Sequence, residues 1–186
     1  MFLIRNFLAI FVLVSGCENP ETAPHTRTLE AARSVHLLSA PTDRLRRFVQ
    51  DYAGPPTEFD RFPARIIVSE LPQNHIVLVY VEKSSRCGSG GCALLILNDM
   101  GSSYEVIGSV IRVHRPVRLL EEARNGHPIF GVWVQGGGIL PGFEQAIAFD
   151  GQRYPHVPED ELSWRAASDA RGTVLIARED VGVLLY

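Results

Sequence analysis

From Pro63 onward the sequence is a succession of short apolar runs separated by turn-forming residues, and this pattern limits the fold more than any other feature. The run at 75–82, HIVLVYVE, is apolar at both sets of alternating positions, so both faces of that strand should be covered. Pro72, Gln73 and Asn74 join it to an earlier run at 65–71. Further strands are expected at 93–97, 104–119, 129–134, 145–149, 174–177 and 181–186. The pattern predicts an antiparallel β meander, either an open sheet or a partly closed barrel.

The run at 104–119 continues its alternation across Pro116, which predicts a single bent strand and not two strands joined by a turn. Apolar residues hold one odd-numbered face along it: Ile107, Ile111, Val113, Val117 and Leu119. With strands that simply run up and down, the glycine-rich loop at 135–142 should then lie at the opposite end of the sheet from the loop at 88–91.

The stretch at 41–52 has the pattern of an amphipathic helix. Its apolar residues fall at i, i+3, i+4 and i+7: Leu45, Phe48, Val49 and Tyr52. Pro41 suits a first-turn position, and Gly54 followed by two prolines should end the helix. A second short helix is expected at 29–38. Strands with one or two N-terminal helices define an α+β fold, which we assign to one domain at 29–186.

Residues 1–16 have the features of a signal peptide: a positive charge at Arg5, an apolar run at 7–14 and small residues at its end. Eight apolar residues are too few to span a bilayer, which needs roughly 20. The sequence Val14-Ser15-Gly16-Cys17 resembles the lipobox of bacterial lipoproteins. That resemblance implies that Cys17 is lipid-modified and begins the mature chain, and that residues 17–28 are a tether. A plain cleaved signal with an incidental Cys17 is the alternative.

The lipobox resemblance also indicates a location. Residue 18 is Glu, and in lipoproteins an Asp at this position is the usual signal for retention in the inner membrane. We therefore expect a lipid-anchored protein at the outer membrane, facing the periplasm.

Cys87 and Cys92 enclose four residues, three of them glycine. In an exported protein, two closely spaced cysteines most often form a disulfide, here between the strands at 75–82 and 93–97. A zinc site would need two further ligands, and a redox motif normally has two residues between its cysteines. A metal site and a redox-active pair are the weaker alternatives.

Three sequence segments carry a second resemblance: CGSGGCALLIL, RNGHPIFGVWVQGGG and FDGQRYP. In this order they resemble a family of uncharacterised bacterial exported proteins, over residues 85–155. In that family a Trp-Arg-Asp type of segment usually follows the Asn-Gly turn, whereas His-Pro-Ile-Phe stands here. The resemblance implies export and the fold, and no particular chemistry.

The charge balance and motifs exclude several functions. With 18 basic against 21 acidic residues and a net charge of −3, the chain has no nucleic-acid-binding character. No HExxH, GxSxG or phosphate-binding glycine motif occurs, so no metal, cofactor or catalytic residue is predicted. A serine hydrolase would need a serine to meet a histidine through the fold; the candidates are Ser69, Ser85, Ser89 and Ser109.

One surface is a candidate for binding. Arg112, His114 and Arg118 should share the even-numbered face of the long strand, opposite its apolar row. A merely solvated or salt-bridged face is the alternative. We therefore expect a lipoprotein whose domain binds or inhibits an envelope protein, or binds a polysaccharide. The second hypothesis is a periplasmic hydrolase with a site assembled from separated loops.

Overall fold

The computed structural model describes residues 39–161 and 163–186. The signal peptide, Cys17, the tether and the helix expected at 29–38 lie outside the described residues. Within them are one α-helix, two short 3₁₀ turns at Pro72–Asn74 and Ser84–Arg86, and nine strands. The helix is α1 (Asp43–Ala53), and the strands are β1 (Arg65–Leu71), β2 (Ile76–Glu82), β3 (Cys92–Asp99), β4 (Tyr104–Arg124), β5 (His127–Gly136), β6 (Ile139–Ile147), β7 (Ser163–Arg165), β8 (Gly172–Ile176) and β9 (Val183–Leu184).

The strands form one antiparallel sheet in the order β7-β6-β5-β4-β3-β2-β1-β9, and β8 pairs with β4 in addition. From β1 to β7 each strand pairs with its successor in the chain, which is a meander. The predicted α+β class is confirmed, and the sheet does not close into a barrel. No helix within the described part of the chain is long and apolar enough to cross a membrane.

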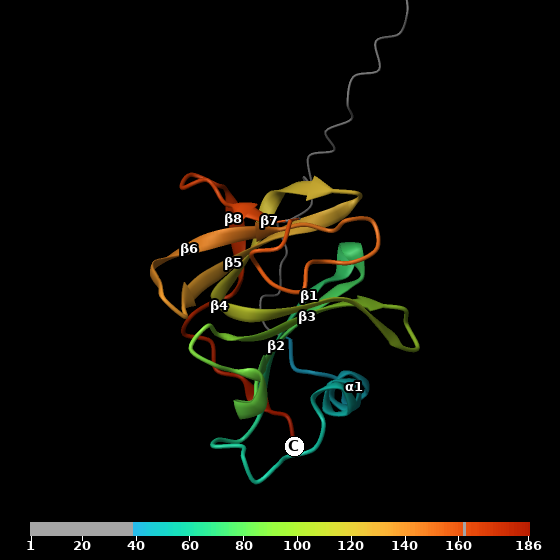
Figure 1. Ribbon diagram of the computed structural model, residues 1–186. Helices are drawn as coiled ribbons and strands as arrows, with labels where there is room; N and C mark the ends of the chain where they lie inside the picture. Colours follow the sequence, from blue (N-terminus) through green and yellow to red (C-terminus); the bar gives the residue numbers. More distant parts are fainter. Residues whose placement is uncertain (1–38, 162) are drawn as a thin grey trace, which may run out of the picture.

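Helix α1 packs against one face of β1, β2 and β3 (Figure 1). Leu45, Val49 and Ala53 are buried there among valines and leucines of the three strands. The Thr42 hydroxyl caps the helix by accepting a hydrogen bond from the Leu45 N–H at 3.1 Å, so Pro41 precedes the cap instead of lying in the first turn. Gly54, with φ +72°, ends the helix as expected.

Strand β4 is one continuous bent strand, as predicted, but it has 21 residues and ends at Arg124 instead of Leu119. Its alternation is not unbroken, however. Val110 takes the core position expected for Ile111, Arg112 has a left-handed backbone with φ +62°, and the pairing with both neighbouring strands shifts register. These bulges let β4 turn, so its first part pairs with β3 and its second part with β5 and β8.

Because β4 turns, the two parts of the sheet face each other across a second core. Residues of β1 to β3 meet residues of β5, β6 and β8 there, with Tyr80, Phe130 and Tyr154 as its aromatic members. In Figure 1, β5 to β8 lie above and β1 to β3, with α1, lie below. Both faces of β2 are buried, which explains its apolar sequence.

Candidate functional site

The two glycine-rich loops lie side by side at the bend of β4, and the expectation that they occupy opposite ends of the sheet was wrong. Cys92, at the start of β3, pairs with Val113 of β4, and Trp133, near the end of β5, pairs with His114. The error came from assuming that β5 pairs along the whole of β4. It pairs only with the second part, so the chain leaves β5 at the middle of β4, where β3 begins.

The contact between the loops depends on glycine. Gly136 has φ +81°, and its α-carbon lies so close to Ser89 that a Cβ atom would overlap the Ser89 carbonyl oxygen. A Cβ atom on Gly91, which has φ +110°, would likewise overlap the Val113 carbonyl. We call this contact region, formed by residues 87–92, 112–116 and 135–139, the loop junction.

Cys87 and Cys92 form the predicted disulfide, with their Cα atoms 4.0 Å apart. Gly88 and Gly91 add two backbone hydrogen bonds, of 2.8 and 3.0 Å, inside the ring. The flanking strands pair in the expected hairpin, with Tyr80 opposite Leu94 and Val81 opposite Ala93. The disulfide therefore fixes one side of the loop junction.

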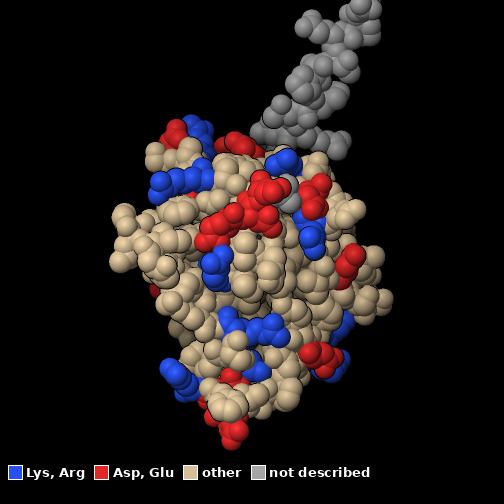
Figure 2. All heavy atoms as spheres, viewed as in Figure 1, with Lys and Arg blue, Asp and Glu red and all other residues tan. Residues whose placement is uncertain are grey.

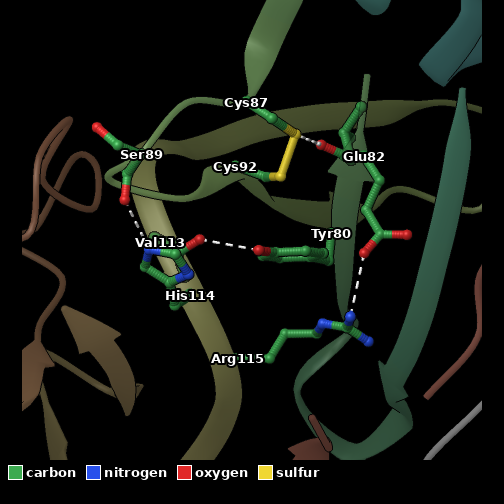
Figure 3. Close-up of a disulfide and its surroundings, with 9 residues drawn as sticks. Tyr80, Glu82, Cys87, Ser89, Cys92, Val113, His114 and Arg115 are labelled. Carbon is green, nitrogen blue, oxygen red and sulfur yellow. Dashed lines mark hydrogen bonds and ion pairs between the residues drawn. A yellow bond between two sulfur atoms is a disulfide. The ribbon is translucent and has the colours of Figure 1, made fainter. Parts of the chain in front are cut away.

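Beneath the disulfide loop, side chains of β2 and β4 hold the bend in place (Figure 3). The Tyr80 hydroxyl donates to the Val113 carbonyl at 2.9 Å, and burial raises the pKa of Tyr80 to about 12, so it remains a donor at neutral pH. Arg115 forms an ion pair with Glu82 at 3.2 Å and donates to the carbonyls of Ala177 and Asp180. These contacts connect the bend of β4 to β2 and to the segment after β8.

The structure separates the three residues of the predicted binding surface. Arg112 is 53% exposed and pairs with Glu159 at 2.8 Å. His114 is half-buried, and its Nε2 lies 3.3 Å from the Ser89 carbonyl oxygen at the loop junction. Arg118 is only 22% exposed and lies on the outer face of the second part of the sheet, beyond the bulge that follows His114. Arg112 and His114 remain candidates for contact with a partner.

Arg118 instead forms hydrogen bonds within the domain. One guanidinium nitrogen donates to Glu144 at 2.7 Å and another donates to the Ala170 carbonyl at 2.8 Å. Glu144 reaches Arg118 by lying over Gly131, where any Cβ atom would overlap its carboxylate. The ion pair between Arg118 of β4 and Glu144 of β6 therefore crosses β5 at Gly131, where there is no side chain to block it.

Two serine and histidine pairs meet, but not through the serine hydroxyl. The His156 Nδ1 lies 2.8 Å from the Ser109 carbonyl oxygen, and His114 similarly contacts the Ser89 carbonyl. The Ser109 hydroxyl is hydrogen-bonded to the Tyr52 hydroxyl at 2.6 Å. A histidine that activates a nucleophile must reach the hydroxyl, so neither pair supports the hydrolase hypothesis. Among the residues that the structure describes, no group of three or more His, Cys, Asp or Glu could hold a metal ion.

The sequence analysis missed one exposed apolar surface. Its large side chains are 43 to 47% exposed: Phe62, Leu184 and Tyr186. They line a pocket of about 400 Å³ together with Pro56, Thr57, Asp60, Arg61, Pro63 and Ala64. We call this surface the apolar patch. Two phenylalanines in a stretch with no strand or helix pattern were the available signal.

The segment behind the apolar patch is fixed by Lys83, the only lysine in the chain. Its buried ammonium donates to the carbonyls of Ala53, Gly54 and Pro55 at 2.7 to 3.1 Å and lies 3.9 Å from Asp60. The cation therefore satisfies carbonyls at the C-terminus of α1, where a positive charge is favourable.

No protein-family model, no curated protein and no solved structure matches the chain. The assignment of function therefore rests on the residues and the geometry described above.

Proposed function

We propose that this protein is a lipoprotein anchored through Cys17 at the outer membrane, facing the periplasm, and that its domain binds another envelope protein without catalysing a reaction. The anchoring is supported by the lipobox-like sequence that ends at Cys17. The compartment is supported by the Cys87–Cys92 disulfide, because disulfides persist where the surroundings are oxidising.

The apolar patch carries the binding part of the proposal. Large exposed apolar patches on soluble domains usually mark contacts with other proteins, membranes or ligands. Here Phe62 of the 55–63 segment lies with Leu184 and Tyr186 of the 181–186 segment around a pocket that can take a partner side chain. A protein partner suits this surface better than a polysaccharide, because a sugar chain needs many hydrogen-bonding groups and the exposed side chains of the patch are mainly apolar. A hydrolase to be inhibited is one partner of this kind.

The anchor is tested by mass spectrometry of the mature N-terminus. We expect acyl chains on Cys17 as the first residue, and an unprocessed or soluble protein after Cys17→Ser. An unmodified Cys17 in an intact, membrane-extracted chain would contradict the anchor.

The partner is sought by cross-linking in the envelope, followed by purification of the lipoprotein. We expect a protein that is captured by the wild type and lost with Phe62→Ser plus Leu184→Ser, which change two side chains that line the pocket. Val174→Ser, at a 38% exposed position on β8, is the matched control. Arg112→Ala tests whether the loop junction adds to the same contact. Capture that is unchanged in the double variant, with its thermal unfolding intact, would remove the apolar patch from the proposal.

A further inference from the structure

A second pocket, of about 300 Å³, lies on the outer face of the sheet. Its wall comes from Leu120, Glu121 and Glu122 of β4, from Trp164 of β7 and from the 166–171 segment. We call it the outer pocket. It shares no lining residue with the pocket at the apolar patch.

A bulge in β4 opens the outer pocket. Leu119 pairs with Phe130 and Ala123 with Pro128, so three residues of β4 lie opposite Ile129 alone. Successive residues in a regular strand point to opposite faces, but the bulge allows the adjacent Glu121 and Glu122 to line one pocket. Beneath it, Leu120 and Ile129 are buried with Ala146 and Ala148.

The far wall of the outer pocket is fastened to the sheet. Arg118 donates to the Ala170 carbonyl, the Ala166 N–H donates to the Glu144 carbonyl at 3.0 Å, and the Glu121 N–H donates to the Arg171 carbonyl at 3.3 Å. These bonds hold the segment at both of its ends. The pocket is therefore formed before any ligand binds.

The outer pocket carries more negative than positive charge. Three carboxylates, those of Glu121, Glu122 and Asp169, line it with one guanidinium, that of Arg171. None of the ion pairs within 39–161 and 163–186 includes these four residues, whereas Arg44, Arg112, Arg115 and Arg118 each pair with a carboxylate. Figure 2 shows acidic side chains on the upper part of the viewed face, with basic side chains beside them.

Trp164 adds a feature that acidic residues alone would not provide. Its side chain is 39% exposed on the wall of the pocket, although it belongs to a short edge strand where a polar residue would suffice. The face of an indole attracts cations, arginine most often. An aromatic wall, adjacent carboxylates and a preformed hollow together describe a site for a flat cation.

We infer that the outer pocket binds an arginine side chain of a partner protein, with the guanidinium stacked on Trp164 and paired with Glu121 and Glu122. Arginine suits the site better than lysine, because its planar group can stack on the ring and also form a fork of hydrogen bonds with a carboxylate. The inference goes beyond the proposed function, since it concerns a different surface.

The test uses the protein with Trp133→Phe, which leaves Trp164 as the only tryptophan, so that fluorescence reports on the outer pocket. The probes are a capped Gly-Arg-Gly-Arg-Gly peptide and the same peptide with citrulline in place of arginine. Citrulline keeps the shape and lacks the charge. We expect the arginine peptide to change the Trp164 emission, at least tenfold weaker binding of the citrulline peptide, and weakening of arginine binding by added salt.

Variants of the pocket complete the test. Glu121→Gln with Glu122→Gln should weaken binding of the arginine peptide at least tenfold, while Glu58→Gln, a change at an exposed acid of the 55–63 segment, should not. Equal binding of the two peptides, equal effects of the two sets of variants, or no binding at millimolar peptide would each overturn the inference. If Trp133→Phe does not fold, calorimetry with the unsubstituted protein makes the same comparisons. Loss of arginine binding would leave partner capture through the apolar patch untouched, so the two proposals fail separately.

Discussion

Gly136 lies against the Ser89 carbonyl oxygen, and this contact joins two residues that are 47 positions apart in the chain. It requires a residue without a side chain for two reasons, the left-handed backbone of Gly136 and the missing space for a Cβ atom. The adjacent Gly137 also has a positive φ, of +58°, but a Cβ atom there would meet no neighbour.

The two glycines therefore form a matched pair for mutation. Gly137→Ala should lower the free energy of unfolding by about 1–2 kcal/mol, because alanine disfavours the left-handed backbone. Gly136→Ala should cost about 1–3 kcal/mol more, because the loops must also separate. Urea denaturation measures both. Equal losses would show that the contact with Ser89 does not restrict residue 136.

Removal of the disulfide should have a moderate effect on stability. Closing a ring of six residues reduces the entropy of the unfolded chain by an amount worth about 2 kcal/mol. Cys87→Ser with Cys92→Ser should therefore lower the free energy of unfolding by about that much and leave the β2–β3 hairpin paired. Reductant should then have no further effect on the double variant. Two free thiols titrating in the native exported protein would contradict the pairing.

The sequence predicted the strands better than it predicted their arrangement. Alternation and turn residues located β1, β2, β3 and β5 to within three residues at each end, because each strand pattern reports which side chains are buried. The extent of pairing between β4 and β5 depends on where β4 bulges. Arg112 adopts a left-handed conformation there without any glycine to mark the position, so the place where the glycine-rich loops meet could not be predicted.

The predicted binding surface also depended on contacts between strands, which the sequence does not show. Arg118 looked like an exposed cation, since its strand position faces away from the core. Its partner Glu144 lies 26 residues away, and the space for that ion pair exists only because residue 131 is glycine. The residue pattern of one strand does not show which side chain of another strand will lie beside Arg118. The disulfide could be predicted because both of its cysteines lie in one short loop.

The Arg118–Glu144 pair should contribute more to stability than the Arg112–Glu159 pair. Both pairs have a nitrogen to oxygen distance near 2.8 Å, but the first is 22% and 16% exposed and the second 53% and 35%. A double-mutant cycle with Arg118→Met and Glu144→Gln should give a coupling energy of about 1–3 kcal/mol. The matching cycle with Arg112→Met and Glu159→Gln should give less than about 1 kcal/mol. Equal couplings would show that the lower exposure of the Arg118–Glu144 pair does not strengthen it.

The ion pair behind the apolar patch should affect stability in acid. The Thr57 N–H donates to the Asp60 carboxylate at 2.8 Å, and with the Thr57 hydroxyl and the charge of Lys83 it lowers the pKa of Asp60 below its usual value near 3.8. Because the pKa is lower in the folded protein than in the unfolded chain, ionised Asp60 stabilises the fold. That contribution is fully present above the unfolded pKa, near pH 4, and is lost as the pH falls through the folded pKa. Asp60→Asn should therefore destabilise the protein more at pH 7 than at pH 2.5, in urea unfolding at each pH. The carbonyl contacts of Lys83 are present in the wild type and in Asp60→Asn, so they cancel in the comparison. A loss of stability that is the same at both pH values would show that Asp60 acts through its shape and hydrogen bonds alone.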